Sequence, residues 1–179
     1  MTDAIVDACC FINLYATADL RGFLTTVAWS WHIASAALAE SLFIRAANDD
    51  DDERESIEPQ AYIDEGLIKL VDVQSAEEAE LYVRLAADLD DGEAMALAIA
   101  TQRGWTLATD DRKAKRFAND FGVPVVTTPE LVQRWAKQAR MTPSRMRTLV
   151  RSIESRARFS PAEDTPGFNW WVRHIRGAS

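Results

Sequence analysis

Short apolar runs alternate with longer segments of helical periodicity along most of this chain. The apolar runs predict buried strands at residues 4–6, 67–71, 105–108 and 123–126. The segments around them predict helices at residues 9–15, 35–47, 59–66, 76–88, 92–104 and 112–121. Buried strands that alternate with helices are typical of an α/β fold, in which helices cover both faces of a mainly parallel sheet.

The pattern changes near residue 130. Helical spacing predicts two further helices, at residues 130–139 and 144–158, and an irregular segment over residues 160–179. The charge changes at the same place, because residues 1–132 hold 25 acidic and 10 basic side chains, whereas residues 133–179 hold 3 and 10. We therefore expect an acidic domain over residues 1–132 and a basic helical C-terminal extension over residues 133–179. Trp170 and Trp171 could stack on bases, but packing against the acidic domain or a dimer contact is the favoured expectation.

Composition excludes several classes of protein. The chain has 179 residues, is 47% hydrophobic and carries a formal net charge of −8, as ordinary globular proteins do. It has no apolar run of about 18 residues and no signal peptide pattern, so we expect a cytoplasmic protein without a membrane partner. Adjacent Cys9 and Cys10 cannot join distant segments, and His32 and His174 lie too far apart in sequence to favour a zinc site. No glycine-rich phosphate loop is present.

Several carboxylates lie where the sequence is otherwise apolar. Asp7 follows the first predicted strand, and Glu40 is the one charge between Ile33 and Ile44. Glu93 precedes seven apolar residues, and Asp110 and Asp111 follow the strand at residues 105–108. A buried charge needs a partner or a metal ion. Each carboxylate alone could cap a helix or pair with an arginine, but together they outnumber the nearby cations. Oxygen ligands without His or Cys favour Mg²⁺ or Mn²⁺.

The segments that carry these acids resemble the four acidic motifs of PIN-domain nucleases. They read IVDACCFINL (5–14), ALAES (37–41), DDGEAMALAIA (90–100) and LATDDRKAKRFA (107–118). Their order and spacing match over about 130 residues, which leaves the C-terminal extension outside the resemblance. The resemblance implies a PIN-like three-layer α/β sandwich around a mainly parallel sheet.

The resemblance also implies site residues. It assigns catalytic roles to Asp7, Glu40, Glu93 and Asp111, and it assigns metal binding to the same four residues with Asp110. Supporting roles fall to Asn13, which would hold Asp7 from the first helix turn, to Thr109, which would orient a carboxylate or a metal-bound water, and to Asp91. Nucleic-acid binding falls to Arg112, Lys113, Lys115 and Arg116, although a solvated helix face explains these four residues equally well. The third motif differs from toxin-like members, where Asp is common at the place of Glu93.

The activity that the resemblance implies is metal-dependent hydrolysis of phosphodiester bonds in single-stranded RNA, with Mg²⁺ or Mn²⁺ as cofactor. The resemblance also suggests that the protein is the toxin of a type II toxin–antitoxin pair, with a small antitoxin protein as its partner. It further suggests that the protein forms a homodimer. Two other interpretations stay open. A non-catalytic PIN scaffold could bind RNA or protein, but all four acidic positions are retained. A Mg²⁺-dependent phosphatase with Asp7 as nucleophile would need a second acid where Cys9 stands.

Overall fold

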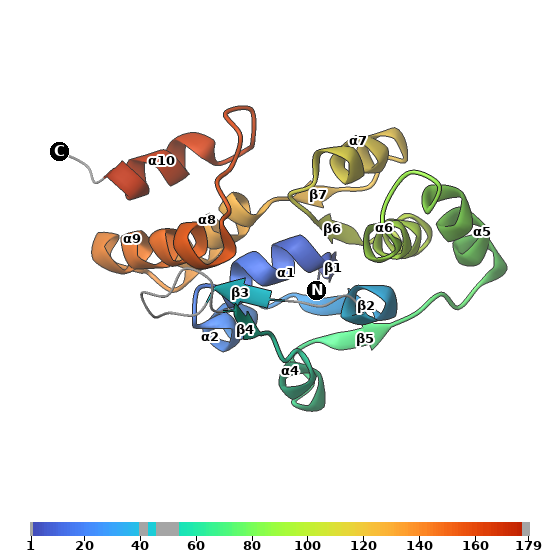
Figure 1. Ribbon diagram of the computed structural model, residues 1–179, viewed down its shortest axis with the longest axis horizontal. Coiled ribbons are helices and arrows are strands. Elements are labelled where there is room, and N and C mark those ends of the chain that lie inside the picture. Colours follow the sequence, from blue (N-terminus) through green and yellow to red (C-terminus); the bar gives the residue numbers. More distant parts are fainter. Residues whose placement is uncertain (1, 40–42, 46–53, 177–179) are drawn as a thin grey trace.

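The computed structural model describes residues 2–39, 43–45 and 54–176, and a five-stranded parallel sheet lies at its centre (Figure 1). The strands are β1 (Asp3–Val6), β2 (Ser30–Ala34), β5 (Lys69–Val71), β6 (Thr106–Ala108) and β7 (Val125–Val126). Their order across the sheet is β5-β2-β1-β6-β7. β1 is central and pairs in parallel with β2 and β6, so that Val6 lies between Ile33 and Ala108. The predicted α/β class with a parallel sheet is confirmed.

Helices cover both faces of this sheet. Those in the first two thirds of the chain are α1 (Ala8–Tyr15), α2 (Leu20–Thr26), α3 (Ser35–Ala39), α4 (Gln60–Asp64), α5 (Ala76–Leu85), α6 (Asp91–Arg103) and α7 (Arg112–Asp120). From the centre of the sheet, the chain runs toward one edge when α1 and α2 lead from β1 to β2. It runs toward the other edge when α7 leads from β6 to β7. Right-handed crossovers therefore put α1 and α7 on opposite faces. α6 lies beneath β1, β2 and β6 with α5 packed behind it, and α1 contacts α8 (Thr128–Gln138) on the other side (Figure 1).

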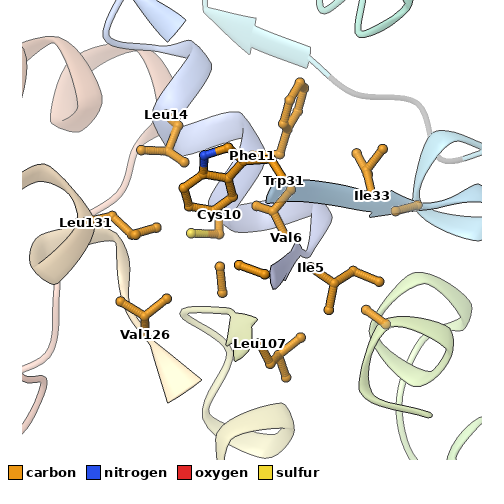
Figure 2. Close-up of a cluster of buried hydrophobic side chains, with 14 of the residues drawn as sticks. Ile5, Val6, Cys10, Phe11, Leu14, Trp31, Ile33, Leu107, Val126 and Leu131 are labelled. Carbon is orange, nitrogen blue, oxygen red and sulfur yellow. The ribbon is translucent and has the colours of Figure 1, made fainter. Parts of the chain in front are cut away.

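The core lies where α1 and the central strands meet. Ile5, Phe11 and Leu107 are each exposed by 1% or less, and Figure 2 shows them in one cluster with side chains from β2, β7 and α8. β1 is apolar on both faces because both faces are covered. This packing fixes the first turn of α1 against the ends of β1 and β6.

The C-terminal extension packs on the same core. It continues α8 and adds α9 (Pro143–Ser152), the π-helical turn η1 (Ile153–Ala157) and α10 (Phe168–Arg176). Trp135, Ile153 and Trp171 are each exposed by 1% or less. The Trp171 ring meets Phe159 edge to face at 5.6 Å, and its indole N–H donates to Glu154 at 3.1 Å. Both of these partners belong to the extension itself, so Trp171 joins α10 to η1 within one continuous buried cluster. The predicted domain boundary between residues 132 and 133 falls inside α8.

Several predicted elements are wrong. The helix expected over residues 35–47 ends at Ala39, and residues 43–45 form β3, which pairs antiparallel with β4 (Arg54–Ser56). Residues 160–179, expected to be irregular, contain α10. The expected helix over residues 144–158 becomes π-helical after Ser152. β3 forms because it pairs with β4, and the pattern within residues 35–47 does not show that pairing.

β2 and α2 are absent from the sequence prediction. β2 contains Ser30 and His32, which interrupt its apolar pattern. His32 is nevertheless buried, because its ring stacks on Trp105 at 3.9 Å and its Nε2 lies 3.0 Å from an Asp3 carboxylate oxygen. None of the helices in the described ranges has the length and apolar character to cross a bilayer.

The substitution Trp171→Ala should lower the free energy of unfolding by about 3 kcal/mol or more, because it leaves a cavity between α10 and the core. Urea denaturation followed by fluorescence measures the change. Val83 is 70% exposed on α5, so Val83→Ala is a suitable control and should change stability by less than about 0.5 kcal/mol. Equal unfolding midpoints for the two variants would mean that α10 does not stabilise the body.

Candidate active site

The carboxyl ends of β1 and β6 bring two acidic segments together. The strands end side by side at Val6 and Ala108, and the N–H of Asp7 donates to the Ala108 carbonyl at 3.1 Å. The residues that follow each strand therefore meet at one edge of the sheet, where open α/β sheets bind their ligands. Asp7 and the segment Thr109-Asp110-Asp111 lie at this edge.

Asp7 is a buried carboxylate that is held by three donors. It is 1% exposed and caps α1, because one of its oxygens accepts from the Cys10 N–H at 2.7 Å. The Cys9 thiol lies 3.3 Å from both of its oxygens, and the Thr109 hydroxyl also bonds to it. Burial raises the pKa of Asp7 to about 7, and the negative charge of Asp110 adds to the rise. Asp7 is thus fixed in position without a cationic partner among its donors.

Asp110 is held by a different set of donors. One oxygen accepts from the Thr128 N–H at 2.9 Å, and the other accepts from the Asn13 side-chain amide at 3.0 Å and from the Thr128 hydroxyl. Burial raises the pKa of Asp110, while these donors and the charge of Lys115 act in the opposite direction. Asp110 therefore ties β6 to α1 and α8. Asn13, which was expected to hold Asp7, donates to Asp110 instead.

Asp111 begins α7. One of its oxygens accepts from the Lys113 and Ala114 N–H groups, each at 2.7 Å, and its own N–H donates to the Thr109 hydroxyl at 3.1 Å. An N-cap that accepts two backbone bonds has a fixed orientation. Thr109 is 0% exposed and links Asp111 to Asp7 through a single hydroxyl. Its role in orienting a carboxylate or a metal-bound water stays a prediction.

Glu93 faces these carboxylates from α6. It lies in the first turn of that helix, where its N–H donates to Asp90 at 2.8 Å. Burial raises the pKa of Glu93 to about 8, and the negative charges of Asp90, Asp111 and Asp7 add to the rise. Glu93 thus lies within electrostatic reach of both Asp7 and Asp111. Asp91 instead hydrogen-bonds with the Tyr82 hydroxyl and so links α6 to α5.

A family model described as a PIN domain, DUF3368, matches residues 3–164. The chain belongs to the PIN-domain family. No curated protein is similar enough to this chain to match it. PIN domains are generally nucleases and usually use divalent metal ions, so this PIN domain has a nuclease fold.

The carboxylate oxygens of this PIN domain suit a hard dication by their chemistry. In the described residues, no three His, Cys, Asp or Glu side chains form a group that could hold a metal ion. Glu40, one of the predicted ligands, lies outside the described residues. The oxygen donors are nevertheless of the kind that Mg²⁺ and Mn²⁺ prefer. Burial first, and neighbouring negative charge second, raise the pKa values of Asp7 and Glu93, and a bound dication would favour the ionised form of both.

The sequence prediction missed Thr128, which binds Asp110 through both its N–H and its hydroxyl. A signal for this position exists in the sequence. Thr127 and Glu130 form a capping box, and the pattern Thr-x-x-Glu with Pro129 marks the start of a helix. This signal places Thr128 at the beginning of α8 but does not show that α8 starts beside β6.

The predicted nucleic-acid-binding residues lie on α7 with different surroundings. Lys113 pairs with Asp88, with Nζ 3.2 Å from its carboxylate, and also bonds to the Asp88 carbonyl. Arg112, Lys115 and Arg116 line an open cleft of about 760 Å³ together with Lys113. The cleft reaches the first residue of the helix that Asp111 caps, although none of the site carboxylates in the described ranges lines it.

Asp7→Asn should raise the free energy of unfolding at pH 8 by roughly 1–3 kcal/mol when divalent metal ions are chelated. The rise in pKa from 3.8 to about 7 corresponds to roughly 4 kcal/mol of unfavourable ionisation. Loss of the carboxylate's hydrogen bonds reduces the gain. Substitutions that relax a repulsive functional site often stabilise the fold.

This gain should shrink at acidic pH. Between pH 3.8 and about 7, folded Asp7 keeps a proton that the unfolded chain has lost, so the wild-type free energy of unfolding falls as the pH rises. Urea titrations at pH 5 and pH 8 measure this slope for the wild type, Asp7→Asn and the exposed control Glu80→Gln. If the wild type and Asp7→Asn had the same slope, burial of Asp7 would carry no electrostatic cost.

Proposed function

We propose that this PIN domain is a metal-dependent endoribonuclease that hydrolyses phosphodiester bonds in single-stranded RNA with Mg²⁺ or Mn²⁺. The observation that supports it most is that Asp7 and Asp111 follow two adjacent strands, while Glu93 of α6 lies within electrostatic reach of both and the pKa values of Asp7 and Glu93 are raised. Repulsion between like charges destabilises the fold, and a bound dication would remove it. Glu40 belongs to this set by its place in the sequence motifs.

The bound metal ion would supply charge for the phosphate and lower the pKa of an attacking water. The residues of the chain would hold that ion and the substrate in place. Asp7 and Asp111 are oriented by backbone N–H donors at the starts of α1 and α7, so their positions do not depend on side-chain partners that move. Asp110 would act as a second metal ligand. Alternatively, its bonds to Thr128 and Asn13 would hold the end of β6 in place against α1 and α8.

Substrate binding would come from α7. Arg112, Lys115 and Arg116 line the open cleft that reaches the first residue of this helix, and Lys115 is close enough for its charge to lower the pKa of Asp110. Cations that neutralise phosphates supply most of the nonspecific affinity for nucleic acids. They would offset the repulsion between the acidic site and the RNA backbone.

A finer part of the proposal concerns protein partners. The same acidic edge is complementary to a basic peptide, which favours regulation by a small antitoxin protein in a type II toxin–antitoxin pair. A homodimer belongs to the same proposal. Purification of the chain from its native host and measurement of its mass in solution test both parts. A monomer without a bound small protein would contradict them.

Asp7→Asn, Glu40→Gln and Glu93→Gln should each lower the rate of RNA cleavage at least about 100-fold. Metal-ion stabilisation of transition-state charge is worth several kcal/mol, and each 1.4 kcal/mol is a factor of ten. The measurement is single-turnover cleavage of a labelled single-stranded RNA with Mg²⁺ or Mn²⁺. Glu80→Gln, an acid-to-amide change on the exposed side of α5, should retain full activity.

Two results would contradict the proposal. Cleavage that survives in all three site variants would come from another site or a contaminant. RNA binding without cleavage, in the wild type and the variants alike, would identify a non-catalytic scaffold. A melting temperature measured for each variant separates loss of chemistry from loss of fold.

A further inference from the structure

The open cleft along α7 has two walls of different chemistry. One wall is α7, where Arg112, Lys115, Arg116 and Asn119 recur at helical spacing and so share one face. The other wall belongs to the connection between η1 and α10, which we call the strap (residues 162–167), and its lining residues are Asp164, Thr165 and Pro166. In Figure 1 the connection that leads into α10 and the helix α7 both lie near the β7 edge of the sheet.

The strap is fixed to the body. Thr165 donates its N–H to the Ala162 carbonyl at 2.9 Å and accepts from the Phe168 N–H at 3.0 Å, so the strap is a closed turn that leads into α10. The Thr127 hydroxyl, whose proton goes mainly to Glu130 at 2.8 Å, lies 3.4 Å from the Pro166 carbonyl.

Close packing at Gly167 holds the strap as well. Gly167 has φ +85°, and a Cβ atom added there would lie 2.9 Å from the Cβ atom of Pro129. The strap therefore rests on the first turn of α8, whose Thr128 binds Asp110. The contact with α8 therefore fixes the position of the strap relative to Asp110.

Asp164 distinguishes this wall from α7. It is exposed, and within the described ranges it has no hydrogen bond or ion pair, although cations line the opposite wall. A carboxylate repels phosphate, so it does not bind the phosphates of an RNA strand. It does accept hydrogen bonds from the amino groups of bases, as Asp and Glu accept from the N4 amino group of cytosine.

We propose that the cleft holds one RNA strand, with phosphates on α7 and a base turned toward the strap, where Asp164 accepts a hydrogen bond from an exocyclic amino group. Single-stranded RNA is suited to this arrangement, because its bases are free to turn away from the backbone and present their edges. Uracil has no amino group, so the strap disfavours uracil at this position. The inference rests on the proposed function, which supplies the RNA strand, and assigns the choice of base to the C-terminal extension.

The test measures binding without cleavage. Fluorescence anisotropy in a chelator gives the affinities of the full-length protein for labelled oligo-C, oligo-A and oligo-U RNA. The wild type should bind oligo-C at least about fivefold more tightly than oligo-U, and Asp164→Asn should remove most of that difference. Arg116→Gln should weaken binding to all three strands by a similar factor and lower the salt dependence by about one counterion.

Glu163→Gln is the matched control, because it removes the same charge from the neighbouring exposed residue, which does not line the cleft. It should leave the preference for oligo-C unchanged. An equal rise in affinity for all three strands in Asp164→Asn would show that Asp164 only repels RNA, and would overturn the inference. So would a wild type that binds the three strands equally or binds none of them.

Failure of the inference and failure of the proposed function give different results. A wild type that cleaves RNA, with the same base preference as Asp164→Asn, refutes only the role of Asp164. A wild type that prefers oligo-C but cleaves no RNA with either metal refutes only the nuclease. The melting temperature of Asp164→Asn should equal that of the wild type, because the substituted side chain is exposed.

Discussion

The pairing of β1 with β6 determines the chemistry of this protein. It forces Asp7 and Asp110, which follow these strands, to share a sheet edge from which water is largely excluded. Two neighbouring buried carboxylates repel each other, and each would be costly alone. The fold keeps both because the strands pair through backbone bonds and the apolar core beneath them is well packed (Figure 2). The remaining features of the site follow from how each charge is compensated.

The two carboxylates are compensated differently. Asp110 accepts from Thr128 and Asn13 and connects three elements, so its charge is largely used in holding the fold. Asp7 also accepts from one backbone N–H and one hydroxyl, but its third donor is a thiol, which is weaker than the amide of Asn13, and its deeper burial raises its pKa to about 7. At this sheet edge, Asp110 serves mainly to hold the fold together, whereas the charge of Asp7 is only partly stabilised. Such an edge is suited to binding a metal ion.

The sequence predicted those parts of the molecule that depend on local pattern. Asp7 stands out because it is an isolated charge after an apolar run, and Glu93 stands out because seven apolar residues follow it. The bond between Asn13 and Asp110 joins residues 97 positions apart, and no local pattern reports it. β2 was missed for a similar reason, because His32 becomes a core residue only when Trp105 stacks on it. Glu40 remains a prediction from sequence.

The charge asymmetry between the two parts of the chain has a structural explanation that the sequence alone does not give. Arg145 of α9 pairs with Asp19 at 2.6 Å, and Arg156 of η1 pairs with Glu55 at 2.7 Å. The extension therefore uses part of its positive charge on acidic side chains of the same chain, across more than 100 residues of sequence. Arginines that neutralise the body contribute less to attracting a phosphate backbone from solution. The cations of α7, which face an open cleft, are better placed to do so, and the extension reaches that cleft through the strap rather than through its helices.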